Sequence, residues 1–392
     1  MTNRQLSTTN PQPLTTDNKL PTTDYRLPTK KIVVTGTRGI PNIQGGIETH
    51  CEGLYPLIAA KGFDVTVFRR KTYVRDNLTS YKGVTLYDIP NIRNKSLETI
   101  VHTFCAIWIA KWKLKADIIH IHAIGPAILT PLARLLGMKV VFTHHGPDYD
   151  RAKWGKIAKF VLRIGERTGC KFANNVIVIS EVIDQIIKQK YKRRDARLIF
   201  NGVPSPVLID DINYLRELGI ESRKYIFTMG RFVPEKNFHT LIRACTNLKQ
   251  TEYKLVIAGD ADIEDSYSRE LKTLAINNGV ILTGFIKHQR LHTLLSHAGL
   301  FILPSTHEGL PLSLLEAMSY QLPVIISDIP ANRQIDLPDD CYFQPDDENA
   351  LSGVIDKRLT HSFFPITYDL EKYNWNTIAQ QTTCIYQKLI KQ

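Results

Sequence analysis

Three short segments of the chain combine residue types that could bind phosphate or sugar groups. In the first, Gly230–Asn237, Arg231 and Lys236 follow an apolar, strand-like run. An arginine fork and a lysine ammonium at the carboxyl end of a strand could neutralise a pyrophosphate without a metal ion. Taken alone, the segment is equally consistent with a solvated loop that carries two cations.

The second segment, His307–Glu316, carries two carboxylates. Glu308 precedes a predicted helix, and Glu316 lies about two turns into that helix. The residues between them are mostly apolar, and a carboxylate buried among them needs partners because burying a lone charge is costly. Ribose or sugar hydroxyls would be suitable partners. The alternative is a helix-capping acid followed by a surface glutamate.

The third segment, Gly36–Glu48, follows the first predicted strand and opens the first predicted helix. Gly45 and Gly46 lack side chains, so backbone amides there could approach a phosphate closely at a helix N-terminus. The segment does not have the G-x-G-x-x-G pattern, which disfavours an NAD-dependent oxidoreductase. A plain strand-to-helix turn is the alternative.

Two series of alternating strands and helices would position these segments. Apolar strand-like runs occur at 31–35, 65–68, 118–121, 140–143 and 176–179, and again at 225–229, 254–258, 280–283, 300–303 and 324–327. Short buried strands alternating with helices predict parallel, doubly wound sheets. We therefore expect an α/β fold of two Rossmann-like domains facing across a cleft, with ligands at the carboxyl ends of the sheets.

The domain boundaries follow from composition and turns. Residues 1–29 are polar and predict a disordered tail. We expect a first domain at 30–205, a second at 206–374 and a C-terminal helix at 375–392 that crosses back to the first domain, with the turn-rich segment 201–206 as a linker. The six cysteines form no C-x-x-C pair, so we expect neither a disulfide framework nor a cysteine zinc site.

In combination, these motifs resemble the retaining, nucleotide-sugar-dependent glycosyltransferases of family 4, which have the GT-B fold. The resemblance rests on Gly230–Asn237, on the E-x7-E pair Glu308 and Glu316, and on Ser327–Asn332, and it spans about residues 30–390. Thr37–Pro41 with Gly45–Glu48 is similar to a subgroup that includes bacterial rhamnosyltransferases.

The segment 145–154 is similar to that subgroup's Asp-Gly-x-Glu-Trp-x-Arg-x-Lys-Trp sequence but departs from it. His145 stands in place of Asp, Asp148 in place of Glu and Tyr149 in place of Trp. These changes lie where the subgroup would select its acceptor or its sugar.

The resemblance implies roles for individual residues. Arg231 and Lys236 would neutralise the leaving diphosphate, Glu308 would contact the donor sugar, and Glu316 would hold the ribose hydroxyls. Backbone amides near Leu312 and Ser313 would help to bind phosphate, and Gly45 and Gly46 would close over the donor. The strand-end histidine His122 matches a family histidine near the reacting sugar, although His120 shares its strand face. Candidates for the acceptor side are His144, His145 and Asp148.

We therefore expect a retaining enzyme that moves a hexose or deoxyhexose, such as rhamnose, from a nucleotide-diphosphate sugar to a glycan or lipid-linked acceptor in bacterial cell-surface polysaccharide biosynthesis. No nucleophilic carboxylate is evident, which favours same-face attack with charge stabilisation by the two cations. We expect no cofactor and no metal, and we interpret Asp260-Ala-Asp262 as a strand end. A nucleotide-sugar epimerase on the same fold and a non-enzymatic basic binding protein are the alternatives.

The positive charge is concentrated in the first half of the chain. Residues 1–205 contain 32 Lys and Arg against 15 Asp and Glu, whereas the remainder contains 18 against 23. Segment 151–171 alone carries seven cations and one acid, with apolar residues at helical spacing (Trp154, Ile157, Val161 and Ile164). Basic amphipathic helices are typical of membrane surfaces, although a core-packed helix with a solvated basic face is the alternative.

We expect a cytoplasmic protein that docks peripherally on the anionic inner face of the plasma membrane through Lys153, Trp154, Lys156, Lys159 and Arg163. The sequence lacks a signal peptide and an apolar run long enough to span a bilayer. Nucleic acid is not expected as a partner, because no recognition motif is present and the cations are not interleaved with aromatic residues.

Overall fold

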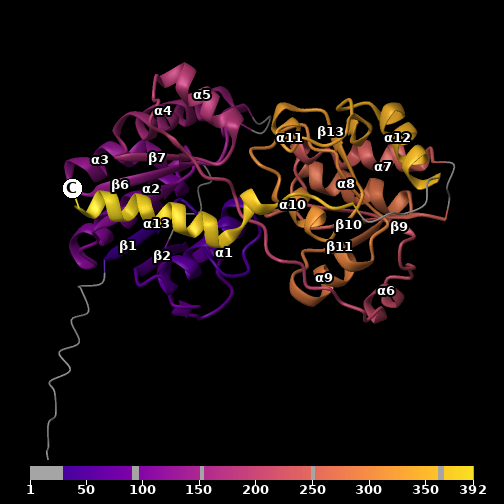
Figure 1. The fold of residues 1–392 in the computed structure, drawn as a ribbon, viewed down its shortest axis with the longest axis horizontal. Coiled ribbons are helices and arrows are strands. Elements are labelled where there is room, and N and C mark those ends of the chain that lie inside the picture. Colours follow the sequence, from indigo (N-terminus) through magenta and orange to yellow (C-terminus); the bar gives the residue numbers. More distant parts are fainter. Residues whose placement is uncertain (1–29, 91–96, 151–153, 249–251, 361–365, 392) are drawn as a thin grey trace, which may run out of the picture.

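The computed structural model describes residues 30–90, 97–150, 154–248, 252–360 and 366–391. These residues form two α/β domains that lie side by side (Figure 1). The predicted tail at 1–29 lies outside the described residues.

The first domain is built on an eight-stranded sheet in the order β3-β4-β2-β1-β5-β6-β7-β8, parallel except for β3. The order reverses between β1 and β5, so the carboxyl ends of these two strands flank a natural ligand site. The strands are β1 (Lys31–Thr35), β2 (Asp64–Arg70), β3 (Ser80–Tyr81), β4 (Val84–Ile89), β5 (Ile118–His122), β6 (Lys139–His144), β7 (Asn175–Val178) and β8 (Arg197–Leu198).

Helices cover both faces of this sheet. Helices α2 (Glu98–Trp108), α3 (Thr130–Leu135) and α4 (Lys156–Phe172) bury apolar residues in one cluster, which also takes in Ile119 and Phe142 of the sheet. Helix α1 (Gly46–Ala60) packs with Ile32 and Val34 in a second cluster on the other face. Helix α5 (Glu181–Tyr191) is capped by Ser180, whose hydroxyl accepts a hydrogen bond from the Ile183 amide.

The second domain is built on a parallel six-stranded sheet in the order β11-β10-β9-β12-β13-β14. Its strands are β9 (Tyr225–Met229), β10 (Lys254–Ala258), β11 (Ile281–Gly284), β12 (Leu300–Leu303), β13 (Val324–Ser327) and β14 (Tyr342–Phe343). Its helices are α6 (Asn213–Glu217), α7 (Phe238–Thr246), α8 (Ser266–Asn277), α9 (His288–His297), α10 (Leu312–Ser319), α11 (Pro330–Arg333) and α12 (Glu348–Thr360). This sheet reverses its order between β9 and β12, which places a second ligand site there.

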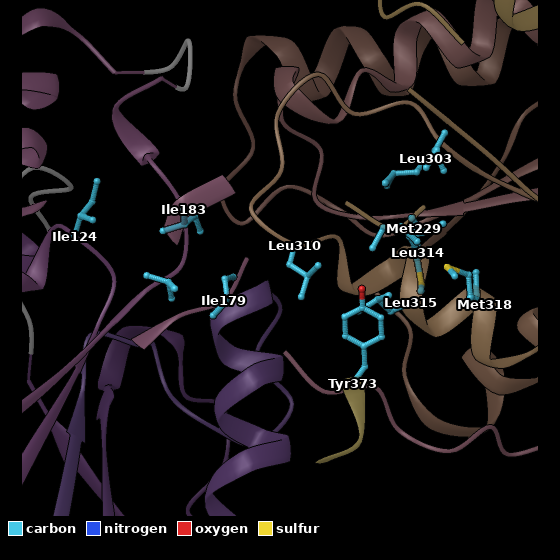
Figure 2. Packing of buried hydrophobic residues seen from close by; sticks show 14 of the residues in the cluster. Ile124, Ile179, Ile183, Met229, Leu303, Leu310, Leu314, Leu315, Met318 and Tyr373 are labelled. Atoms are coloured by element: carbon cyan, nitrogen blue, oxygen red, sulfur yellow. The ribbon is translucent and has the colours of Figure 1, made fainter. Parts of the chain in front are cut away.

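The two domains share part of their apolar core. Ile179 and Ile183 of the first domain and Leu310 and Leu314 of the second belong to one buried cluster (Figure 2). Because this packing lies beside the loop that carries Glu308, it fixes how closely that loop approaches the first domain.

The last helix, α13 (Trp375–Lys391), returns to the first domain and packs along α1 (Figure 1). The Trp375 indole lies against Gly53 and Gly202, where an added Cβ would come within 2.5 and 2.1 Å of the ring. Farther along α13, Tyr386 is fully buried and its hydroxyl bonds His120 Nδ1 at 2.5 Å. Among the described residues, no helix is both long and apolar enough to cross a bilayer.

Candidate active site

The carboxyl ends of the two sheets face each other, and their loops make direct contacts. Arg38 Nη1 pairs with Asp262 Oδ1 at 2.7 Å, and Gln44 Nε2 donates to the Asp260 carbonyl at 3.4 Å. Nearby, Lys287 Nζ pairs with Glu52 Oε2 at 3.0 Å. These bonds join the loop after β1 and helix α1 to the second domain, so the site lies between the domains.

Two arginines from different domains share one carboxylate at this junction. Arg231 Nη1 lies 3.1 Å from Asp262 Oδ2, while Arg38 holds the other oxygen. Burial alone would raise the pKa of Asp262, but the two arginines outweigh it and hold that pKa below its usual value. A second anion entering between the arginines would find two cations already positioned. Arg38 is a candidate that the motif analysis missed.

The two acids of the D-x-D sequence do not converge on one point. Asp260 pairs with Lys272 Nζ at 2.9 Å, whereas Asp262 is held by the arginines. Both lie in the loop after β10, which ends at Ala258. A carboxylate that already has a cationic partner is a poor cation ligand, so this pair does not fit a metal.

Lys236 and Glu308, predicted from separate motifs, are brought into contact. Lys236 Nζ lies 2.6 Å from Glu308 Oε1, and both side chains are largely buried. Lys236 ends a 3-10 turn that starts at Pro234, and the Thr306 amide donates to the Glu235 carbonyl. A backbone hydrogen bond therefore fastens the two loops together beside the ion pair, which makes a fixed charged wall for a ligand.

Helix α10 presents its first turn and Glu316 to the same site. Leu312 and Ser313 are its first two residues and are partly buried. Burial raises the pKa of Glu316 to about 7, and the charge of Lys287 only partly opposes the rise. Within the described parts of the chain, the Glu316 carboxylate has no hydrogen-bond partner, so its oxygens are available to donors on a ligand.

Gly45 and Gly46 keep the N-terminus of α1 open. Gly45 has a φ of 144°, and a Cβ added to it would lie 2.1 Å from Glu48 Oε2, while Gly46 faces open space. The Glu48 carboxylate accepts a hydrogen bond from the Arg38 amide at 2.9 Å and one from the Thr37 hydroxyl at 3.3 Å. Glu48 thus fixes the loop that carries Arg38.

His122 lies at the end of β5 in a group of buried rings. Its Nδ1 is 2.8 Å from His145 Nε2, and its Nε2 is 2.5 Å from the Tyr55 hydroxyl, which also bonds His120 Nδ1 at 2.9 Å. Burial, reinforced by the neighbouring imidazoles, lowers the pKa of His122 well below its usual value and that of His145 to about 3. Both rings are neutral at pH 7.

The predicted acceptor residues separate into two groups. His145 is partly exposed. A Cβ added to Gly309 would lie 2.3 Å from the His145 carbonyl oxygen, so His145 borders the loop that carries Glu308. Asp148 is partly exposed in the next turn. The structure does not bring His144 together with them: its ring is fully buried, with Nε2 2.9 Å from Glu166 Oε1 and Nδ1 accepting from the Gly146 amide.

The predicted membrane helix corresponds to α4, and Lys153 lies outside the described residues. Trp154 and Lys159 are partly buried, whereas Lys156 and Arg163 are exposed. The predicted apolar stripe does not lie on one buried face, because Ile157 is 83% exposed while Val161 and Ile164 are partly buried. Phe160, which the spacing did not single out, is 63% exposed.

A basic groove of about 990 Å³ runs between α4 and the segment after α5. Its apolar lining includes Phe160, Ile164 and Cys170. Its cations are Arg163, Arg167, Lys171, Lys190, Lys192, Arg193 and Arg194. Seven of the 32 cations of the first half therefore line one groove.

Comparison with known proteins identifies both halves of the chain. Residues 44–205 match the family model described as Glycosyltransferase Family 4, and residues 210–369 match the one described as Glycosyl transferases group 1. An uncharacterized glycosyltransferase of Methanocaldococcus jannaschii is 24% identical over 88% of this chain and 95% of its own length. The Escherichia coli UDP-Gal:alpha-D-GlcNAc-diphosphoundecaprenol alpha-1,3-galactosyltransferase is 29% identical over 71% of this chain and 75% of its own.

Solved structures share the whole architecture. Sucrose-phosphate synthase from Thermosynechococcus elongatus superposes with a TM-score of 0.75 at 22% identity, covering 92% of this chain and 99% of that one. Anabaena HepE in complex with UDP and glucose gives a TM-score of 0.72 at 18% identity, covering 92% of this chain and all of that one (100%). The expected GT-B fold is confirmed.

Proposed function

Because the protein is a glycosyltransferase with the GT-B fold, we propose that it transfers a hexose or deoxyhexose, such as rhamnose, from a nucleotide-diphosphate sugar to a lipid-linked glycan, with retention, in bacterial cell-surface polysaccharide biosynthesis. The observation that carries the proposal is the meeting of Lys236 with Glu308, beside α10 and across from His145. Each is a residue type that the donor's diphosphate or sugar would require.

The donor side divides its work among charges and hydroxyl acceptors. Lys236 and Arg231 offset the charge that grows on the diphosphate as its bond to the sugar breaks, and fixed cations in a water-poor site are effective at this. Glu316 accepts hydrogen bonds from the ribose. Glu308, steered by Lys236, accepts from a sugar hydroxyl.

On the acceptor side, His145 borders the donor loop at Gly309, and the fully buried His122 bonds His145 Nε2 and orients its ring. His145 is neutral, so it can approach the oxocarbenium-like sugar without carrying a charge there. The leaving phosphate takes the acceptor proton in a same-face attack. A lipid-linked acceptor is supported by the E. coli relative, whose name specifies a diphosphoundecaprenol-linked sugar.

The direct test is transfer from a panel of UDP-, GDP- and dTDP-sugars to a saccharide linked to polyprenyl diphosphate. We expect nucleoside diphosphate to be released only when one donor and the acceptor are both present. The product should keep the donor's anomeric configuration by NMR, and chelation with EDTA should not lower the rate. Conversion of the donor to another sugar nucleotide without acceptor would instead indicate an epimerase, and rescue of a chelated enzyme by manganese would overturn metal-independent transfer.

Binding of UDP should strengthen as the pH rises through about 7. Only ionised Glu316 can accept both ribose hydrogen bonds, and its pKa is about 7. The ionised fraction therefore rises from about one tenth at pH 6 to about nine tenths at pH 8, which gives a gain of about tenfold in affinity. Calorimetric titrations of UDP at both pH values provide the measurement.

The substitution Glu316→Gln should remove this gain, whereas Glu270→Gln, an exposed carboxylate on α8, should retain it. Protonation of the UDP phosphate changes the affinity by the same factor in every variant. The difference in pH dependence between the variants therefore isolates Glu316. An unchanged pH profile in Glu316→Gln would remove Glu316 from the ribose site.

The membrane partner is part of the same proposal. Helices α2 and α4 cover the same face of the first sheet. Helix α2 and the turn after it expose three aromatic residues, Phe104, Trp108 and Trp112. Helix α4 exposes Ile157 and Phe160 beside the basic groove. Exposed aromatic rings next to cations suit the headgroup region of an anionic leaflet. Docking there would bring the cleft to the cytoplasmic face, where a lipid-linked acceptor would be reached.

The protein should therefore co-sediment with phosphatidylglycerol vesicles at low salt but not with phosphatidylcholine vesicles. The double substitution Ile157→Asp and Phe160→Asp should weaken binding about tenfold, since it removes apolar insertion and adds repulsion. Ile276→Asp, at an exposed position on α8 of the second domain, is the control and should bind normally. Failure of the parent protein to bind anionic vesicles would reject the docking surface.

A further inference from the structure

Three histidines from separate elements converge beside the cleft. His50 comes from α1, His122 from the end of β5 and His145 from the loop after β6. Each offers one ring nitrogen, and the three nitrogens lie within 4.8 Å of one another. The ring centroids are 5.6 Å apart for His50 and His122 and 5.1 Å apart for each of the other two pairs.

One nitrogen of the group is unsatisfied. His50 is 3% exposed, and its Nδ1 makes no hydrogen bond in the described parts of the chain, although the Asn201 side chain lies near the ring. A buried polar atom without a partner is costly, so its persistence points to a ligand. The ring stands nearly edge-on to that of His145, at 76°.

A hydrogen bond at Nε2 fixes the orientation of the His122 ring. Its Nε2 bonds the Tyr55 hydroxyl at 2.5 Å, which leaves Nδ1 directed at His145 Nε2, 2.8 Å away. In metal sites, the outer nitrogen of a histidine ligand is held in this way by a hydrogen-bonding neighbour, which orients the ring. A metal ion entering between Nδ1 and Nε2 would replace their shared proton.

The set also leaves one side open. His145 is partly exposed and borders Gly309 of the donor loop. Three imidazoles with one free position are a ligand set that suits Zn²⁺ at bond lengths of about 2.0–2.1 Å. Nitrogens bound to one ion at that length lie about 3.3 Å apart, so small rotations of the rings would complete the site.

We propose that His50, His122 and His145 bind one Zn²⁺ ion, or a similar divalent transition-metal ion, at the acceptor side of the cleft. Binding moves the proton between His122 and His145 to the outer nitrogen of the ring that carries it, so both rings stay neutral, and the open position takes a water molecule. The consequence for catalysis, which rests on the proposed function, is inhibition: the ion and its water stand beside the donor loop, where His145 borders Gly309. This is consistent with transfer that needs no metal.

Binding is tested on the purified full chain with the metal alone. Titration of Zn²⁺ against a chromophoric chelator should give one tight site per chain, and Co²⁺ should produce the visible absorption of a tetrahedral nitrogen-rich site. His145→Gln and His50→Gln should each weaken Zn²⁺ binding about 100-fold. His239→Gln, a half-buried histidine on α7 of the second domain, is the matched control and should bind as the parent does.

Thermal melting without metal establishes whether each variant is folded. If the His50 variant fails to fold, the His145 variant, at a partly exposed position, still tests the site. Absence of a tight site in the parent, or binding that neither histidine variant weakens, would overturn the proposal and direct attention to the free cysteines. Tight binding without any sugar transfer would sustain the metal site and reject the proposed function instead. Transfer that Zn²⁺ does not inhibit, despite a filled site, would refute the inhibition.

Discussion

Replacement of Lys236 by alanine is expected to lower kcat for sugar transfer by about 10²–10³-fold, the usual effect of removing one charge-stabilising group from a preorganised site. Lys236 is largely buried and lies 2.6 Å from Glu308. Its loss therefore removes a cation from the leaving diphosphate and also takes the Lys236 ammonium away from the Glu308 carboxylate. That carboxylate would then repel the phosphate as its charge develops.

The effect should fall on kcat more than on the KM for the donor, because the charge on the diphosphate grows mainly in the transition state. Lys236→Arg should recover part of the rate, since the charge is kept while the geometry changes. The double variant Lys236→Ala with Glu308→Gln should be little worse than Lys236→Ala alone, because the two side chains act as a unit.

Lys254→Ala is the matched control for this prediction. Lys254 lies at the opposite, amino end of the same sheet, where its ammonium donates to the Gly219 carbonyl. Its replacement should leave the kinetic constants within about twofold of the parent, as expected for a surface substitution away from the site. A kcat for Lys236→Ala within a few-fold of the parent would mean that the diphosphate leaves elsewhere.

The elements that the sequence predicted well are those with continuous apolar runs. Five strands begin and end at the predicted residues: β1, β9, β10, β12 and β13. Their apolar runs are continuous because both faces of each strand are buried. Strand β4 (Val84–Ile89) was missed, since polar Thr85 and Asp88 interrupt its apolar residues. The two-residue strands β3, β8 and β14 carry too little pattern for any prediction.

The candidate site was predictable where a motif lies in one short segment. Lys236 and Glu308 each sit in such a segment, and their contact follows from the parallel strand ends. Arg38 and Asp262 were not predictable, because their bond joins loops of different domains, 224 positions apart in the sequence. The group formed by His50, His122 and His145 likewise depends on how α1 packs against two strand ends.

Burial of Glu166 explains why His144 lies apart from the other predicted acceptor residues. In the sequence, Glu166 looks like the one counter-charge of a basic surface helix. In the structure it is fully buried and accepts hydrogen bonds from His144 Nε2 at 2.9 Å, Tyr149 at 3.1 Å and Lys190 at 2.5 Å, and also from the Tyr191 hydroxyl. The helix turns its acid inward, so the acid bonds the His144 ring in the core of the domain.

Glu166→Ala should accordingly destabilise the first domain by about 3–5 kcal/mol, the range for breaking a buried ion pair by removing one partner. His144 and the tyrosine hydroxyls would be left buried without their acceptor, and Lys190 would lose its anion. Glu166→Gln should cost less because it keeps the volume and one acceptor. Urea unfolding followed by far-UV circular dichroism gives the free energies of unfolding.

The matched control is Arg167→Ala, at the neighbouring exposed position of α4, which should change the free energy of unfolding by less than about 0.5 kcal/mol. Equal losses for Glu166→Ala and Arg167→Ala would show that the network contributes nothing specific.

The stability that Glu166 supplies should also depend on pH in a direction fixed by its pKa. Burial alone would raise that pKa, but hydrogen bonds from His144, Lys190 and Tyr191 outweigh it and lower the pKa from about 4.5 to about 2. A carboxylate with a depressed pKa stabilises the fold above its unfolded-state pKa and loses that contribution as the pH falls between the two values. The parent should therefore lose stability between pH 4.5 and 2 more steeply than Glu166→Gln, which has no proton to bind there. Parallel profiles for the two proteins would assign the acid sensitivity to other carboxylates and leave the network with a role in packing alone.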